Sequence, residues 1–348
     1  MGMTFSTKAG TLASLKGVLK SARIVPLYVF SVETWGKDRE SCLEGVIKNL
    51  GPAPWIVRSS SGKEDQAEVS NAGAFLSIQN VENNNLFSAI EEVIASYGES
   101  DLSDEILIQP MLTHVVRSGV VFSHDPNTGA PYRIINWSDS ADTSAVTAGM
   151  ESRLWQQAAK SPVAPPRMFK QIISLLDELM PLFGNLPLDF EFAISEESGS
   201  EELWLLQARP LIIQDICQTE KSQSGLLASI HSKVADGMKQ HPFLIGNRTV
   251  YGVMPDWNPA EIISTRPKPL AFSLYRQLIT NDIWAEQRAQ FGYRDVRPHP
   301  LIISFSGQPY VDVRASFNSF IPKSVSDESA HRIVNAYTAL LSANPHYH

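Results

Sequence analysis

The sequence predicts a mixed α+β protein of about two or three domains. Its 348 residues exceed the length over which a chain normally builds one hydrophobic core. Helical apolar repeats alternate with short strand-like runs along most of the chain. Hydrophobic residues make up 43% of the sequence, which excludes a disordered or low-complexity chain.

The composition also indicates which classes of molecule the protein does not bind and where it is located. With 29 basic and 37 acidic residues the formal net charge is -8, which disfavours non-specific binding to nucleic acid. Cys42 and Cys217 are too few for a disulfide framework, and no apolar run is long enough to span a membrane. We therefore expect a cytoplasmic protein that binds neither nucleic acid nor a membrane.

The N-terminal part alternates between helical and strand patterns. Gly51-Pro52 should end the second helix, and Asn84 or Asn85 can cap the third. The predicted elements are helices around 12–19, 42–50 and 86–97, with strand-like runs at 24–30 and 55–58.

The middle of the chain is richer in strands. The composition of residues 125–129 (DPNTG) predicts a turn. The predicted elements are strands at 105–109, 119–123 and 132–137, a loop over 138–164, a helix over 167–183, and a hairpin of 188–194 and 202–208.

After Pro210 the pattern changes. Residues 214–224 are polar and typical of a linker. The predicted elements that follow are a helix around 226–238, a segment built on 269–291, two strands within 301–313 and a helix over 325–343.

The predicted hairpin carries the most informative polar side chains, because residues two apart on a strand share a face. One face would carry Asp189, Glu191, Gln207 and Arg209, and the other Phe190, Phe192, Trp204 and Leu206. Two carboxylates on a rigid sheet can hold Mg2+, and an arginine beside them suits a phosphate. The alternative is a solvated face with a Glu191–Arg209 ion pair.

A second polar cluster, Arg58-Ser59-Ser60-Ser61, ends a predicted strand. Hydroxyl groups and exposed amides beside an arginine can cradle a phosphate, and the alternative is an ordinary loop with solvated serines. Lys8, at a predicted helix start, is either a further phosphate ligand or a solvated lysine. The sequence contains no GxxxxGK[ST], GxGxxG, HExxH or GxSxG motif, so the P-loop, Rossmann, zincin and hydrolase-elbow sites lose their support.

Several motifs then follow one another in a recognisable order. They are residues 55–65 (WIVRSSSGKED) with 70–73 (SNAG), 108–111 (IQPM) with 118–129 (SGVVFSHDPNTG), and Asp189-Phe190-Glu191 with 206–210 (LQARP). Together they resemble the ATP-binding domain of the phosphoenolpyruvate synthase and pyruvate phosphate dikinase family. The resemblance spans 5–212 and implies an ATP-grasp fold, in which ATP lies between two α/β lobes with Mg2+ on its phosphates.

The resemblance also implies which residues bind the cofactors ATP and Mg2+. The matching positions are Lys8, Arg58, Gln109, Asp189, Glu191, Gln207 and Arg209. Of these, Asp189 and Glu191 match an acidic pair that lies near the metal and the ribose. Arg58 and Arg209 match the catalytic, phosphate-contacting arginines, and the metal ligands would be Glu191 and Gln207. Lys8 matches a lysine that follows two glycines, where this chain has Ser6-Thr7.

Segments of the C-terminal part resemble a narrower branch, the capsule-associated kinases that include L-glutamine kinase. The segments are 256–261 (DWNPAE), 292–296 (GYRDV) and 312–320 (DVRASFNSF), and Asn136-Trp137 with 143–149, earlier in the chain, is similar to the same branch. Candidate groups for an amino-acid or carboxylate substrate are Asn258, Arg294, Arg297, Arg314 and Asn318. The alternative is that these polar residues are solvated or structural.

These inferences predict the ATP-binding part of an ATP-dependent phosphotransferase. We expect an ATP-grasp domain at 1–213 with its lobe boundary near 100–110, a linker and helix at 214–245, and a substrate-associated segment at 246–348. The family passes phosphate through a histidine in a GGxxxHxA-type stretch that this sequence does not contain. The phosphohistidine domain is therefore expected on a longer chain or a partner, with L-glutamine as the favoured acceptor. The alternatives are an enzyme acting on pyruvate and a non-catalytic ATP-binding module.

Overall fold

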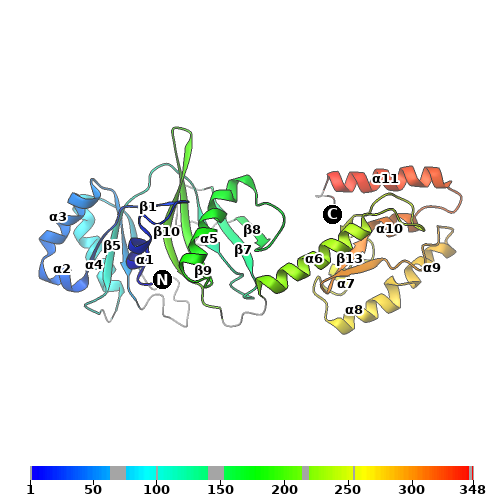
Figure 1. Ribbon diagram of the computed structural model, residues 1–348, viewed down its shortest axis with the longest axis horizontal. Coiled ribbons are helices and arrows are strands. Elements are labelled where there is room, and N and C mark those ends of the chain that lie inside the picture. Colours follow the sequence, from blue (N-terminus) through cyan, green and yellow to red (C-terminus); the bar gives the residue numbers. More distant parts are fainter. Residues whose placement is uncertain are drawn as a thin grey trace. The chain divides into compact units, whose positions relative to one another are not determined.

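The chain forms two compact units, Met1–Gln223 and Ser224–His348. Both combine helices with β-sheets in the computed structural model, so the predicted α+β class is confirmed (Figure 1). The structure describes residues 2–62, 76–98, 101–139, 153–213, 219–253, 255–344 and 347. Among the helices in these ranges, none combines the length and the apolar character needed to cross a membrane.

The first lobe of the N-terminal unit is a four-stranded antiparallel sheet, in the order β2-β5-β3-β4, with helices packed on one face. Its elements are β2 (Tyr28–Ser31), α2 (Val32–Lys37), α3 (Arg39–Leu50), β3 (Trp55–Ser60), β4 (Ser77–Val81), α4 (Leu86–Ser96) and β5 (Glu105–Pro110). Trp35, Val46 and Ile90 of the helices share a core with Trp55 and Ile108 of the strands. The helices thus bury the apolar face of the sheet, as alternating strand patterns require.

Short-range signals set the ends of these helices. The Asp38 carboxylate caps α3 by accepting a hydrogen bond from the Ser41 amide at 2.9 Å, and Gly51, with a φ of 77°, ends it. The expected capping of α4 by Asn84 or Asn85 is wrong. These residues belong to a 3-10 turn, η1 (Asn83–Asn85), and Asn85 has a helical backbone conformation in which its side chain caps nothing.

The second lobe is a six-stranded sheet in the order β1-β10-β9-β6-β7-β8, in which β1 and β10 run parallel and the other pairs antiparallel. Its elements are α1 (Lys8–Leu15), β1 (Arg23–Ile24), β6 (Val115–Phe122), β7 (Tyr132–Ser138), β8 (Arg153–Ala158), η2 (Arg167–Phe169), α5 (Lys170–Leu182), β9 (Leu188–Glu197) and β10 (Ser200–Pro210). Leu176 and Leu179 of α5 share a core with Phe190 and Phe192 of β9 and with Leu12 of α1. This core holds the hairpin on a rigid support.

The prediction of a loop over 138–164 is wrong for residues 153–158, which form the strand β8. Residues 153–158 pair with β7, and Trp155 lies opposite Ile135. The segment is polar and its Leu154 side chain is exposed, so no local periodicity marks it as a strand. The strand is stabilised by its pairing with β7, and the sequence pattern of the segment itself does not reveal this pairing.

The β9–β10 hairpin contains a bulge that decides which side chains face the core. Its cross-strand pairs are Trp204 with Ala193, Leu205 with Phe192, Gln207 with Glu191, and Arg209 with Asp189. Leu206 is the extra residue, and it shifts the alternation by one position. Leu203 and Leu205 therefore enter the core, and the prediction that Trp204 and Leu206 share the face of Phe190 and Phe192 is wrong. The four polar side chains nevertheless share one face.

Gly119 lies where β6 passes very close to its neighbours. A Cβ atom there would collide with the carbonyl oxygen of Asn136 and meet the ring of Phe192. Replacing Gly119 by alanine is therefore expected to destabilise the N-terminal unit by about 1–3 kcal/mol, because the strand must shift. Urea unfolding measures the effect, with Gly36→Ala, at an open position of α2, as the control. Equal stability of the two variants would contradict this prediction.

The C-terminal unit contains a three-stranded sheet in the order β11-β13-β12. Its core includes Trp284, Leu301 and Val311. The elements from residue 220 onward are α6 (Glu220–Gly237), β11 (Tyr251–Gly252), α7 (Pro259–Ile262), α8 (Pro269–Tyr275), the π-helical turn η3 (Arg276–Thr280), α9 (Ile283–Gln290), β12 (Ile302–Phe305), β13 (Gln308–Asp312), α10 (Val313–Ser319) and α11 (Asp327–Ala343). The two strands and the final helix predicted from the sequence are confirmed.

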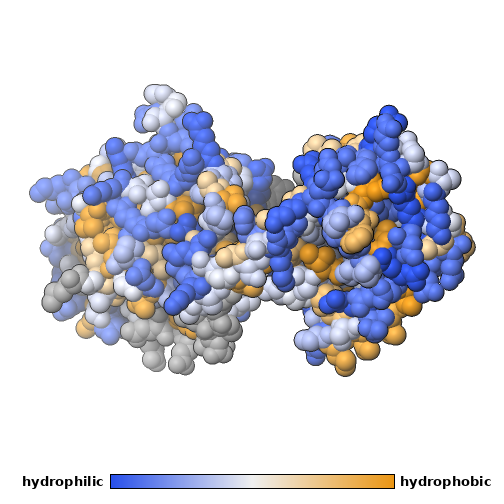
Figure 2. Space-filling view, turned by 45° about the vertical axis from the view of Figure 1, so that its right-hand side comes forward, coloured by the Kyte–Doolittle hydropathy of each residue, from blue (hydrophilic) through white to orange (hydrophobic). Residues whose placement is uncertain are grey.

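Leu270, Leu274 and Leu278 place exposed apolar side chains at every fourth position of α8 and η3. Figure 2 shows hydrophilic residues over much of the visible surface and hydrophobic patches on the C-terminal unit. Adjacent exposed apolar residues are typical of a contact surface.

Candidate functional site

Polar side chains lie on the face of the first sheet that is opposite its helices. The register pairs Arg58 with Leu107 and Ser60 with Glu105. Directly paired residues share a face, and Leu107 belongs to the core of the second lobe. Arg58, Ser60 and Glu105 are therefore directed towards that lobe.

Arg58 joins the two lobes. Its Nη1 donates a hydrogen bond to the Leu206 carbonyl oxygen at 3.3 Å, and its Nη2 donates to Gln207 Oε1 at 3.1 Å. The same Nη2 lies 3.5 Å from Glu191 Oε2. The Arg58 side chain is only 11% exposed, so three acceptors hold a largely desolvated cation. The structure thus brings three of the sequence-predicted site residues together.

Arg209 is anchored on the same face of the hairpin. Its Nε donates to Asp189 Oδ1 at 2.8 Å. The Asp189 side chain is 6% exposed, whereas that of Arg209 is 48% exposed. A buried carboxylate therefore fixes one edge of the guanidinium, while the Arg209 side chain remains partly exposed. This arrangement leaves Arg209 able to contact a ligand in the site.

The segment that leads into α1 is tied to the first sheet. Thr7 Oγ1 donates to Glu105 Oε2 at 2.7 Å, and the Ala9 amide donates to Ser60 Oγ at 3.0 Å. These bonds bracket Lys8 and place the start of α1 beside β3 and β5. Sequence reasoning missed Glu105. The pairing of β5 with β3 would have revealed it, because that register places it opposite Ser60.

Gln109 and Ser61 make buried hydrogen bonds. The Gln109 side chain is 3% exposed and donates to the Val25 carbonyl oxygen at 3.5 Å. Ser61 Oγ donates to Asp104 Oδ1 at 2.5 Å. Gln109 thus bonds the backbone at Val25, whereas Ser61 bonds the side chain of Asp104. The motif residues 63–65, 70–73 and 143–149 lie outside the described part of the chain, as does Cys217.

The residues at the hairpin fit a magnesium ion that shares its coordination with a ligand. Glu191 and Gln207 each direct an oxygen at the same Arg58 nitrogen, so one cation can reach both oxygens. Carboxylate and amide oxygens are the donors that Mg2+ accepts, and phosphate oxygens and water complete its octahedron. Among the described residues, no cluster of three or more His, Cys, Asp or Glu side chains could hold a metal ion. A metal at the hairpin would therefore depend on ligand oxygens.

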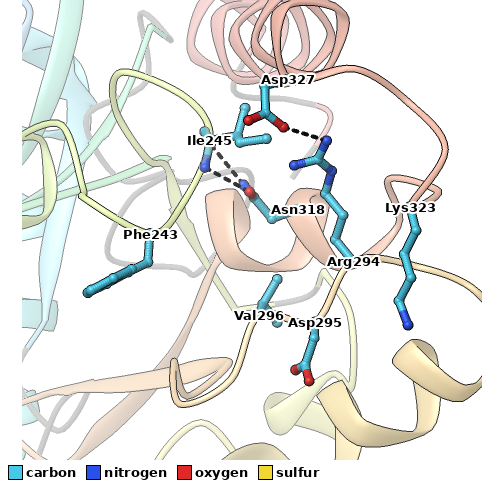
Figure 3. Close-up of a pocket in the computed structure, with 8 residues that line it drawn as sticks. All are labelled: Phe243, Ile245, Arg294, Asp295, Val296, Asn318, Lys323 and Asp327. Carbon is cyan, nitrogen blue, oxygen red and sulfur yellow. Dashed lines mark hydrogen bonds and ion pairs between the residues drawn. The ribbon is translucent and has the colours of Figure 1, made fainter.

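In the C-terminal unit, Arg294 and Asn318 line a cavity of about 360 Å³. Figure 3 shows the Arg294 guanidinium beside Asp327, whose Oδ1 lies 2.7 Å from Arg294 Nη2. Asn318 bonds both its amide nitrogen and its oxygen to the backbone of Ile245, each at 2.8 Å. Asn318 is thus a fixed part of the cavity wall, and the Arg294 guanidinium provides a positive charge in the cavity.

The other three candidate substrate residues make local contacts. Arg314 is 2% exposed and donates to the Lys239 carbonyl oxygen at 2.8 Å and to that of Gly237, at the end of α6. Asn258 caps α7 through its side-chain oxygen. Arg297 pairs with Asp295 at 2.7 Å, and this hydrogen bonding lowers the pKa of the Asp295 carboxyl. None of these three residues lines the cavity that Arg294 and Asn318 share.

Residues 37–152 match the family described as the pyruvate phosphate dikinase AMP/ATP-binding domain. The matched range contains Arg58 and Gln109 but not the β9–β10 hairpin. No curated protein matches the chain. The family match supports an ATP-binding domain in this part of the chain.

Solved structures that resemble the chain do so at low similarity. The D-alanine-D-alanine ligase of Helicobacter pylori has 14% identity and a TM-score of 0.38, over 63% of this chain and 60% of the ligase. The biotin carboxylase domain of the 2-oxoglutarate carboxylase of Hydrogenobacter thermophilus has 13% identity and a TM-score of 0.37, over 60% of this chain. The chain spans 60% and 40% of the lengths of these two proteins.

Proposed function

We propose that this chain is the ATP-binding part of an ATP-dependent phosphotransferase of the phosphoenolpyruvate synthase type. The observation that carries the proposal is the convergence of Arg58 with Glu191 and Gln207, from motifs up to 149 residues apart in sequence. A phosphate-binding arginine and two hard oxygen donors at one point suit the phosphates of a nucleotide. The match of residues 37–152 to an AMP/ATP-binding domain supports the same function.

In this proposal, residues 1–213 form an ATP-grasp domain and ATP lies between its lobes. Lys8 begins α1 of the second lobe, next to β3 and β5, Gln109 belongs to β5 of the first lobe, and Asp189 and Glu191 belong to the hairpin. Arg58 and Arg209 offset the negative charge that redistributes over the phosphate oxygens during transfer. Glu191 and Gln207 would hold Mg2+, which neutralises charge on the phosphates. The buried Asp189 keeps Arg209 in place, so little reorganisation is needed during the reaction.

The acceptor is proposed to be a small amide or carboxylate such as L-glutamine, phosphorylated through a phosphohistidine domain on a longer chain or a partner. The segment at 246–348, after a linker and helix at 214–245, would contribute to acceptor binding. The Arg294 cavity supports this assignment, because it offers a guanidinium next to a carboxylate. Assays of the full-length protein with L-glutamine and with pyruvate separate the two acceptors. Phosphorylation of pyruvate alone would contradict the amide assignment.

Titration calorimetry with a non-hydrolysable ATP analogue tests nucleotide binding by this chain. We expect Mg2+-dependent binding, and we expect Arg58→Ala to weaken it about 10–100-fold, because a hydrogen bond to a charged group is lost. Arg39→Ala is the control, since Arg39 is exposed on α3 of the same lobe and pairs with Glu91. Absence of binding by the folded wild-type chain, or equal affinity of the two variants, would contradict the site.

A further inference from the structure

We infer that Arg58 and a divalent cation compete for the same two oxygen atoms. This inference rests on the proposed nucleotide site. Arg58 Nη2 lies 3.1 Å from Gln207 Oε1 and 3.5 Å from Glu191 Oε2. These are the two oxygens that suit Mg2+. The Arg58 nitrogen contacts both of the proposed metal ligands, so its positive charge already balances them.

A metal ion and this guanidinium cannot share the position. A magnesium ion requires its oxygen ligands at about 2.1 Å. Two cations that use the same pair of oxygens would lie only a few ångströms apart, in a place where little solvent screens their repulsion. Arg58 is 11% exposed and is also held by the Leu206 carbonyl, so it does not turn aside without losing three acceptors. Binding of a metal ion alone must break these contacts.

Phosphate oxygens weaken this competition between Arg58 and the metal ion, because they offer Arg58 an alternative set of hydrogen-bond acceptors. Arginine binds phosphate through two parallel hydrogen bonds, which replace the contacts to the hairpin. Glu191 and Gln207 are then released to a metal ion. Nucleotide and metal therefore favour each other's binding, and the coupling is reciprocal. Arg58 makes the site select a metal–nucleotide pair over a free divalent cation.

Mn2+ without nucleotide is the probe, and its free concentration is measured by electron paramagnetic resonance. We expect Arg58→Met to bind Mn2+ about ten-fold or more tightly than the wild type. Arg209→Met is the matched control. It also removes one positive charge from the cluster, but Arg209 is held by Asp189, so Glu191 and Gln207 stay paired with Arg58. We expect it to tighten Mn2+ binding less than three-fold, as a partly exposed charge is screened by solvent.

The outcomes separate the inference from the proposed function. Equal tightening in both variants would show that charge alone matters, and unchanged Mn2+ affinity in Arg58→Met would show that Arg58 does not compete; either result overturns the inference. Arg58→Gln repeats the test if the methionine variant does not fold, as judged by circular dichroism. Failure of the wild type to bind the ATP analogue with Mg2+ would instead contradict the proposed function, whatever the Mn2+ result.

Discussion

Replacing Arg209 by alanine is expected to slow ATP-dependent phosphoryl transfer about 100–1,000-fold, the cost of losing one preorganised group that stabilises charge in a transition state. The expectation follows from the proposed function. Arg209 is fixed by the buried Asp189 and is 48% exposed, so it can contact a phosphate. Arg209 belongs to the hairpin surface and not to the core, but it is the counter-ion of the buried Asp189 carboxylate, so circular dichroism and urea unfolding first establish that the variant is folded. Phosphoryl transfer is measured in the protein together with its phosphohistidine domain.

Arg23→Ala is the matched control for this experiment. Arg23 lies in β1 on the edge of the same sheet, pairs with Glu202, and has a 69% exposed side chain. Both variants lose a guanidinium from an ion pair on one sheet, but only Arg209 belongs to the polar face. We expect the Arg23 variant to keep its rate. Equal rates in the two variants would refute the catalytic assignment of Arg209.

Replacing Asp256 by alanine is expected to destabilise the C-terminal unit by about 3–5 kcal/mol, because it leaves a buried guanidinium without its counter-ion. The Asp256 carboxylate makes two hydrogen bonds with Arg288, at 2.6 and 2.7 Å. The two side chains are 10% and 11% exposed. Arg288 also lies 4.0 Å from the centroid of the Phe320 ring. After the substitution the Ser319 hydroxyl and the Phe320 ring remain beside the guanidinium, but neither carries the negative charge that balances a buried cation.

The effect is measured by urea unfolding, with hydrogen exchange used to follow the two units separately. Asp295→Ala is the control, because Asp295 also pairs with an arginine of this unit but at the surface, where an ion pair contributes at most about 1 kcal/mol. The N-terminal unit should keep its protection in both variants. A loss in Asp256→Ala no larger than that in Asp295→Ala would contradict the assignment of Asp256 and Arg288 as a structural pair.

The Asp256–Arg288 pair belongs to a hydrogen-bond network that gives several residues of the C-terminal motifs a structural role. Asp256 begins one motif, and Ser316 and Ser319 come from another; Ser316 Oγ donates to Asp256 at 2.7 Å. Arg288, which no motif included, donates to Ser319 at 2.6 Å. Buried polar groups must be paired, and these residues pair one another. Stability of the unit therefore accounts for these positions without any contact to a substrate.

Local periodicity was sufficient to predict most elements of the fold. The apolar face of α4, the strands β5 and β7 and the long hairpin all follow from the spacing of their own residues. The same spacing placed Asp189, Glu191, Gln207 and Arg209 on one face of a hairpin. These features depend on neighbours a few positions apart in the chain, so a single sequence contains the information.

Contacts between distant segments required the tertiary structure. The sequence did not show that β8 is a strand, that Leu206 forms a bulge, or that Leu203 and Leu205 are core residues. It did not show that Arg58 reaches Gln207, which is 149 residues away. Alternation specifies two faces of a strand, but packing against the rest of the molecule decides which face is buried and where an extra residue is inserted. The polar residues were therefore evident from the sequence, whereas their meeting at one point was decided by how the two sheets pack.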